Sequence, residues 1–332
     1  MAVPFNGKDL VLGVGHSHFP HRTAPLIALD RGYFAEEGFG RVDVLVSGDD
    51  DTTMRALLAG DIHVGLDIAP IVALKARNEG HPVFIIGAMV NGLGFFLMAK
   101  PEIKTIKDLA GRRIQVVETG GGIDERQVRV LLAKNGIDPD KDVIFVRKAP
   151  FPLLRNAKAA FDQDVADARM VLNVDLEEAR DAGYPILYDF FAEYPAGYPQ
   201  RSIMATQGFI EAHADRLKAF LRAMVRAYRF MRLDRNYKDV MAVVRKNVTE
   251  PNLGLPAHIP ADFLDKPFFA FKQSPADGAV SLDGLDLYIA ERVPPDQRTI
   301  GAADLLHLAL VKEVSEGLDR RYGKDAYEPM QG

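Results

Sequence analysis

The sequence predicts a two-lobed α/β protein in which each lobe is a mostly parallel sheet flanked by helices. Its 332 residues exceed the roughly 250–300 at which a single hydrophobic core stops growing. Short apolar runs rich in β-branched residues alternate with helical segments, as in right-handed βαβ units. This pattern occurs twice, on either side of a glycine-containing break at 92–94. We therefore expect two sheets rather than one.

The first half of the pattern lies before residue 90. Period-two or continuous apolar runs predict strands, and amphipathic spacing with polar or glycine ends predicts helices. We expect strands at 10–14, 42–46, 63–66 and 83–88, and helices at 23–34, 52–59 and 68–78.

The second half repeats the pattern and is followed by a helical C-terminal part. We expect strands at 95–99, 114–117, 143–146, 170–173 and 202–205, and helices at 106–109, 125–134 and 212–233. These elements place lobe I at residues 1–94 and 204–332 and lobe II at 95–203, with a ligand cleft between the lobes. Residues 251–332 fit the pattern least.

Composition excludes several classes of function. The 41 basic and 46 acidic residues give a net charge of −5 and are scattered along the chain, so nucleic acid is not an expected partner. The chain has no cysteine, which excludes disulfides and thiolate chemistry. No run approaches the ~18 apolar residues of a membrane span, so we expect a chain that does not span a membrane.

The first residues bear on location. The opening segment has no basic stretch, and its apolar run is short and interrupted by glycine, unlike the core of a signal peptide. Two expectations remain open. The protein is periplasmic if an export leader has been removed from this chain, and otherwise it is cytoplasmic.

Ligand chemistry is expected in loops at the carboxyl ends of the strands. The first such loop contains His16, Ser17, His18 and His21, which offer hydrogen bonds and a stacking surface. A solvated loop with one useful histidine is the alternative. A metal held by the three histidines is a further alternative, but their spacing matches no fixed metal geometry, and we expect no metal.

Two further loops carry carboxylates. In 47–53, Asp51 or Thr52 is expected to cap the following helix, and three successive aspartates make the potential negative and disfavour a sulfonate. Asp67 ends a strand just before Pro70, so it either caps the next helix or accepts a hydrogen bond from an amine or amide on a ligand.

The fourth loop, which begins at residue 119, is the best candidate for an anion-binding site. Backbone N–H groups without side chains can approach a ligand at a helix N-terminus, although such turns are also ordinary connectors. The spacing matches neither the dinucleotide nor the P-loop motif. The candidate residues of this loop are Thr119, Gly120, Gly121 and Gly122. Asn173, at the end of a strand of the second lobe, and Asn91, at the expected crossing between the lobes, are further polar candidates.

Aromatic residues are dense between the second sheet and the last predicted strand. They could form a wall over a planar ligand, although packing inside a lobe is the commoner use of such a cluster. Together with the histidines and Asp67, they favour an aromatic or heteroaromatic ligand. The residues concerned are Phe151, Tyr188, Phe190, Phe191, Tyr194 and Tyr198.

Three segments in this order resemble a family of solute-binding proteins. They run from 28 to 38 (ALDRGYFAEEG), from 56 to 65 (ALLAGDIHVG) and from 106 to 114 (IKDLAGRRI). The resemblance is to the alkanesulfonate, taurine, nitrate and thiamine-pyrimidine binding proteins, and to the yeast-type pyrimidine synthases built on the same fold. It implies a periplasmic-binding-protein-like fold of the Venus-flytrap type II class, which closes on a ligand between two lobes.

The resemblance implies capture of a small polar organic ligand, without a cofactor, for the membrane subunits of an ABC-type importer. The alternative is a cytoplasmic enzyme on the same scaffold, such as an aromatic-acid decarboxylase or a pyrimidine synthase. The sequence has no G-x-S-x-G or H-E-x-x-H motif and lacks the cysteine-rich iron motif of those synthases, so we expect no catalytic residues. Fold analogy alone does not decide between the two.

Overall fold

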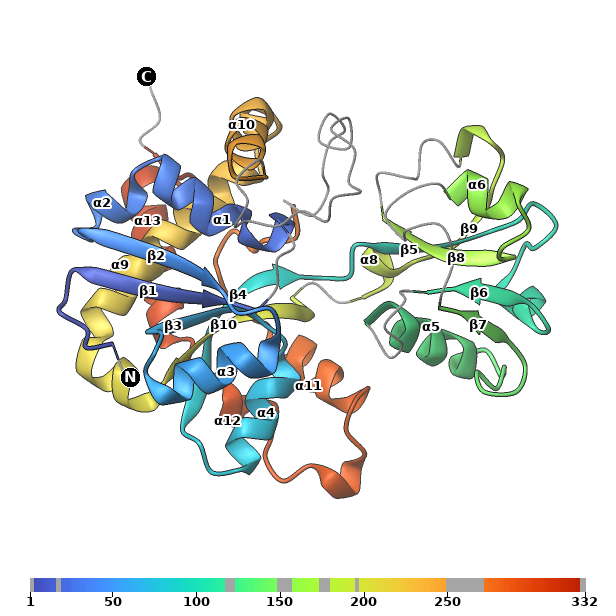
Figure 1. Ribbon diagram of the computed structural model, residues 1–332, viewed down its shortest axis with the longest axis horizontal. Coiled ribbons are helices and arrows are strands. Elements are labelled where there is room, and N and C mark those ends of the chain that lie inside the picture. The colour runs from blue at the N-terminus through green and yellow to red at the C-terminus, as the bar shows by residue number, and fades with distance from the viewer. Residues whose placement is uncertain are drawn as a thin grey trace. The chain divides into compact units, whose positions relative to one another are not determined.

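The computed structural model consists of two compact units (Figure 1). The first contains the described residues up to Gly92 and those from 197 onward, and the second runs from Leu93 to Tyr194. The structure describes residues 3–15, 19–116, 123–147, 157–172, 180–194, 197–248 and 272–328.

The first unit is built on a five-stranded sheet of order β2-β1-β3-β10-β4. β1 pairs in parallel with both β2 and β3, whereas β10 runs antiparallel between β3 and β4. All five residues of β3 are buried, as expected for a strand covered on both faces. The strands are β1 (Asp9–Val14), β2 (Arg41–Val46), β3 (Val64–Ile68), β4 (Val83–Asn91) and β10 (Pro199–Thr206).

Helices cover both faces of this sheet. Figure 1 shows α3 and α4 on one side, where they contact β3 and β4, and α1 and α9 on the other, where they pack on each other. The helices are α1 (Phe19–Asp30), α2 (Tyr33–Glu36), α3 (Asp50–Ala59), α4 (Pro70–Asn78), α9 (Gln207–Met231), α10 (Tyr237–Val248), α11 (Leu282–Ala290), α12 (Ala302–Leu305) and α13 (Ala309–Tyr322), with short 3₁₀ turns η3 (Asp234–Asn236) and η6 (Pro295–Gln297).

The second unit repeats this plan with a sheet of order β7-β6-β8-β5-β9. β6 pairs in parallel with β7 and β8, and β5 pairs antiparallel with β8 and β9. Its strands are β5 (Phe95–Ala99), β6 (Arg113–Gln115), β7 (Ile144–Val146), β8 (Ala168–Leu172) and β9 (Ile186–Asp189). Its helices are η1 (Ile106–Leu109), α5 (Ile123–Lys134), α6 (Ala157–Asp162) and α8 (Phe190–Glu193).

Each sheet is mostly parallel, as expected, because one strand, β10 or β5, runs against the other four strands of its sheet. The structure departs from the expected division of the chain in one respect, since residues 197–203 lie in the first unit and not in the expected lobe II. The reason is that β10 pairs with β3 and β4 along its length, starting from the pair of Pro199 with Asn91.

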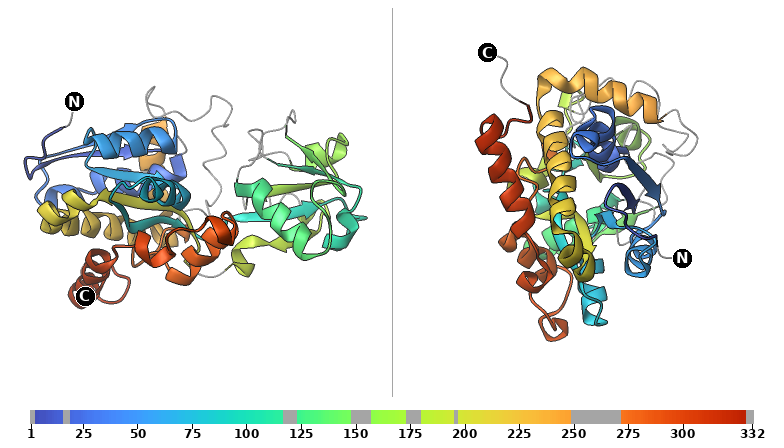
Figure 2. Two further views of the ribbon diagram at one scale, coloured as in Figure 1. Left: turned by 90° about the horizontal axis from the view of Figure 1, so that it is seen from below. Right: turned by 90° about the vertical axis from the view of Figure 1, so that its left-hand side faces the viewer.

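The C-terminal residues complete the first unit. Residues 272–284 run across β4, where the backbone N–H of Ala88 donates to the carbonyl of Gly278 at 2.8 Å. Gly284 packs so closely that a Cβ there would lie 2.6 Å from the carbonyl oxygen of Gly197. Farther along, α13 lies against α9, as Figure 2 shows. Among the described helices, none has the length and apolar character needed to cross a bilayer.

At the amino ends of β1 and β3, a buried histidine holds the N-terminal residues. The N–H of Val11 donates to Nδ1 of His63 at 3.0 Å, so Nε2 carries the ring proton and faces the carbonyl of Val3 at 3.0 Å. The ring also contacts Phe5 at 5.0 Å and Phe209 at 5.5 Å between centroids. Burial lowers the pKa of His63 below its usual 6.5.

We predict that this histidine makes the protein less stable in mild acid. Because its folded-state pKa is depressed, its contribution is complete above about pH 6.5 and is lost as the pH falls through the folded-state value. Urea unfolding between pH 7.5 and 5 measures how the free energy of unfolding changes with pH. We expect this change to be smaller in His63→Gln, because glutamine retains a donor and an acceptor but does not titrate. Equal changes in both proteins would contradict the prediction.

Candidate ligand-binding site

Four segments of the first unit bring charged side chains to the carboxyl edge of its sheet, next to Gly15, which follows β1. β3 contributes Asp67, α3 begins at Asp50, and α1 carries Arg22 in its first turn. β10 runs in the opposite direction and carries Arg201 near its start. This is the edge at which ligands bind in open α/β sheets.

Asp50 connects these segments. Its two carboxylate oxygens accept from Nη1 of Arg201 at 3.2 and 3.0 Å, and Oδ2 also accepts from the N–H of Ala69 at 3.1 Å. A Cβ on Gly15 would lie 2.6 Å from Oδ1 of Asp50 and 3.0 Å from the carbonyl of Asp67. Glycine at position 15 therefore makes room for the carboxylate.

Asp67 lies next to Arg201 in the same site. Its side chain is completely buried, and Oδ1 is 3.7 Å from Nε of Arg201. Arg22, on the first turn of α1, is also buried; burial lowers the pKa of its guanidinium, and the charge of Asp67 acts in the opposite direction. The two carboxylates and two guanidinium groups thus balance in charge.

The two predicted helix caps are wrong. The cap of α3 is Asp49, whose carboxylate accepts from the N–H of Thr52 at 2.6 Å, because the helix begins at Asp50. The cap of α4 is Ala69, since that helix starts at Pro70. Asp67 lies within β3 instead, in a left-handed backbone conformation with φ of 59°. A capping role therefore does not account for Asp67.

Asn91 ends β4 at the same edge, with β10 between it and β3. Its side-chain amide donates to the carbonyl of Ala279 at 2.9 Å and so fixes the C-terminal segment to the sheet. The structure gives Asn91 this anchoring contact, and its role in binding stays a prediction.

The remaining predicted residues lie outside the described part of the chain. They are His16, Ser17, His18, Thr119, Gly120, Gly121, Gly122 and Asn173, together with the side chain of His21. His16, Ser17 and His18 lie in the sequence between Gly15 and α1, whose first turn contains His21, and Thr119–Gly122 precede α5. Among the residues that the structure describes, no group of three or more metal-ligating side chains is placed to hold a metal ion.

In the second unit, the start of α5 carries a buried carboxylate. Glu125 accepts from Nη2 of Arg147, which follows β7, at 2.6 Å and from Nε of Arg129 at 2.9 Å. Arg129 in turn lies over the ring of Phe145, 4.6 Å from its centroid. The carboxylate of Glu125 therefore pairs with two guanidinium groups of the same unit.

The predicted aromatic cluster is divided between the two units. Tyr188 and Phe190 lie 4.7 Å apart and Phe190 and Tyr194 6.1 Å apart, all in the second unit. Tyr198 is buried in the first unit, 5.6 Å from Tyr288. Phe191 is partly exposed, whereas Phe151 lies outside the described residues. Tyr198 therefore belongs to a different unit from Tyr188, Phe190 and Tyr194.

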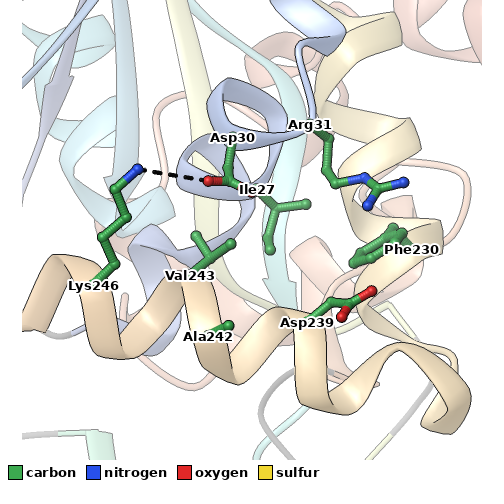
Figure 3. A pocket seen from close by; sticks show the side chains of 8 residues that line it. All are labelled: Ile27, Asp30, Arg31, Phe230, Asp239, Ala242, Val243 and Lys246. Atoms are coloured by element: carbon green, nitrogen blue, oxygen red, sulfur yellow. Dashed lines mark ion pairs between the residues drawn. The ribbon is translucent and has the colours of Figure 1, made fainter.

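A separate groove lies between α1 and α10 (Figure 3). Its volume is about 300 Å³, with Ile27, Val243 and Phe230 as an apolar floor. Lys246 and Asp30 pair across one end at 3.8 Å. None of the candidate ligand residues lines it, so we treat it as a crevice between two packed helices.

We predict that Gly15→Ala destabilises the protein by about 1–3 kcal/mol, the typical cost of overpacking a filled site. The new methyl carbon would lie 2.6 Å from Oδ1 of Asp50 and 3.0 Å from the backbone carbonyl oxygen of Asp67. Gly208→Ala is the matched control, since a Cβ there meets nothing within 4 Å. Thermal unfolding of both variants measures the effect. A Gly15→Ala protein as stable as the control would show that the site relaxes freely.

Sequence reasoning missed three residues of this site. Asp50 was noticed only as part of an acidic run, and neither Arg22 nor Arg201 was singled out. An arginine inside a buried strand was the available signal, because such a charge must have a partner in the fold.

Comparison with known proteins identifies relatives. The putative binding protein YtlA of Bacillus subtilis is 26% identical over 256 residues, covering 74% of this chain and 73% of the relative. The nitrate/nitrite binding protein NrtA of Nostoc is 25% identical, covering 67% of this chain and 54% of its own. The chain thus spans about half of that relative.

The fold also matches solved structures. The periplasmic aliphatic sulphonate binding protein SsuA of Escherichia coli superposes with a TM-score of 0.60 at 18% identity, covering 90% of this chain and 98% of SsuA. The expected periplasmic-binding-protein-like α/β fold is thereby confirmed. Residues 20–234 match the family described as NMT1/THI5 like, and the chain belongs to that family.

Proposed function

We propose that this protein is the solute-binding component of an ABC-type importer and captures a small polar ligand, aromatic or heteroaromatic in character. The observation that carries the proposal is the charged edge of the first sheet, found in a chain of this family and fold. Carboxylates and guanidinium groups converge there from four segments, which is the arrangement expected of a polar recognition site.

Two features support an aromatic ligand. Tyr188 and Tyr194 pack against the buried ring of Phe190 in the second unit and are themselves half-buried, so part of each tyrosine ring is exposed. The predicted loop of His16, Ser17 and His18 follows directly on Gly15, at the charged edge. A planar ligand with polar substituents would use both kinds of group.

The proposed mode of binding is closure of two lobes on the ligand. The boundary between the units falls after Gly92 and again after Tyr194, so two connections near each other in the fold would act as the hinge. The first lobe would contribute Asp67, Asn91 and the histidine loop. The second would contribute the Thr119–Gly122 turn and Asn173.

The family relatives support a place outside the cytoplasm and a membrane partner. NrtA and SsuA carry names that describe binding proteins, and SsuA is described as periplasmic. By the same reasoning, this chain would deliver its ligand to the membrane subunits of an importer. Its net charge of −5 suits a freely diffusing carrier.

Binding and catalysis can be separated by the fate of the ligand. We predict that small molecules released from the purified protein, identified by mass spectrometry, are returned unchanged after incubation with fresh protein, with or without a divalent metal. A true ligand should stabilise the folded state by about 2.7 kcal/mol at a hundredfold excess over its dissociation constant. Thermal unfolding measures this gain.

Variants give the control. We expect His16→Ala or His18→Ala to weaken binding at least tenfold, about 1.4 kcal/mol, whereas His81→Ala, at an exposed turn, leaves it unchanged. Turnover of the ligand that disappears in His16→Ala or His18→Ala would refute the carrier function. Metal-dependent loss of carbon dioxide from an aromatic acid would point to the enzyme instead.

A further inference from the structure

We propose that the charged edge of the first sheet selects a ligand group that pairs a hydrogen-bond donor with an acceptor and has no net negative charge, and that Asp50 sets this preference. This inference rests on the proposed function and names the class of ligand. It concerns the group that faces Asp50 and Arg201, whatever the remainder of the ligand contacts in the second unit.

The cations at this edge are already neutralised by the protein. Nη1 of Arg201 donates to both oxygens of Asp50, and its Nε faces Asp67. Arg22 is buried with Asp67 as its charged neighbour. An anionic ligand would therefore have to displace a carboxylate or lie beside one without a compensating charge, which is unfavourable in a half-buried site.

Two backbone donors at this edge are also occupied. The N–H of Thr52, in the first turn of α3, donates to Asp49, and that of Ala69, before α4, donates to Asp50. A helix N-terminus normally attracts anions through such free N–H groups.

What the edge offers instead is an acceptor beside a donor. The side chains of Asp50 and Arg201 keep 16% and 19% of their surface exposed, so both remain within reach of a ligand. A carboxylate next to a guanidinium group complements an amide, an amidine or an amino-substituted heterocycle, whose edge presents N–H next to a lone pair. Such a group adds no negative charge.

The test compares ligands that differ only in charge. The full chain is titrated calorimetrically with benzamide against benzoate, nicotinamide against nicotinate, and with nitrate and butanesulfonate. We expect the amide of any pair that binds to be favoured at least tenfold, and nitrate and butanesulfonate to bind no better than the carboxylates. The ligand released from the purified protein should likewise have no net negative charge.

Variants assign the preference to Asp50. We expect Asp50→Asn, which removes the charge but keeps the shape, to reduce the preference for the amide to less than threefold. Asp51→Asn removes an equal charge from the next residue without touching Arg201, and should leave the preference intact. If Asp50→Asn does not fold, the wild-type comparison still decides whether anions are rejected.

The outcomes distinguish the two proposals. A carboxylate, sulfonate or nitrate that binds wild-type protein as tightly as the amides, or a negatively charged natural ligand, overturns this inference and leaves the binding function standing. Equal loss of preference in Asp50→Asn and Asp51→Asn removes the specific role of Asp50. If neither the panel nor the purified protein yields any ligand, the binding function fails and this inference with it.

Discussion

The ion pair between Asp50 and Arg201 is the contact on which the arrangement of the charged edge of the first sheet depends. It joins α3 to β10, and through the N–H of Ala69 it also fixes the connection between β3 and α4. Removing one partner of a largely buried pair typically costs about 3–5 kcal/mol, because the other charge is left without compensation. Gly15 and Asp67 both adjoin this pair, since a Cβ on Gly15 would lie 2.6 Å from Oδ1 of Asp50 and Oδ1 of Asp67 is 3.7 Å from Nε of Arg201.

The same principle recurs on the opposite face of the unit, where α9 buries two arginines. The guanidinium group of Arg229 is enclosed and reaches Asp319 at 2.9 Å and the hydroxyl of Ser315 at 3.0 Å, both on α13. Arg226 reaches Glu36 at 2.6 Å and lies 4.0 Å from the ring centroid of Tyr33. Charged contacts therefore tie the C-terminal helix to the sheet-covering helix, alongside apolar packing.

Most of the fold could be predicted from the sequence because its signals are local. Strands such as 42–46 and 95–99 and the helix at 52–59 show their periodicity within a few residues, and the structure places β2, β5 and α3 there. The antiparallel course of β10 and its membership of the first unit could not be read this way. They depend on pairing with β3 and β4, more than a hundred residues earlier in the chain.

The candidate site was harder to predict, since ligand edges are assembled from distant segments. Asp67 was expected either to cap a helix or to accept a hydrogen bond from a ligand, and the capping alternative is wrong, because the helix starts later and the residue is buried within a strand. The position of Arg201 in a buried strand indicated only that it must have a partner, because that partner, Asp50, is 151 residues away. Sequence patterns locate the strand ends, whereas the charges that meet there follow from the three-dimensional pairing.

The hydrogen bonds of the N-terminal residues have a practical consequence for handling the protein. Val3 is held by Gly60, just before β3, and by His63, at the amino ends of the strands. The charged site lies at the carboxyl ends of the same strands. A surface or a fluorescent reporter attached through the N-terminal residues would therefore leave from the far edge of the sheet. Immobilisation in this orientation directs the charged edge of the first unit away from the point of attachment.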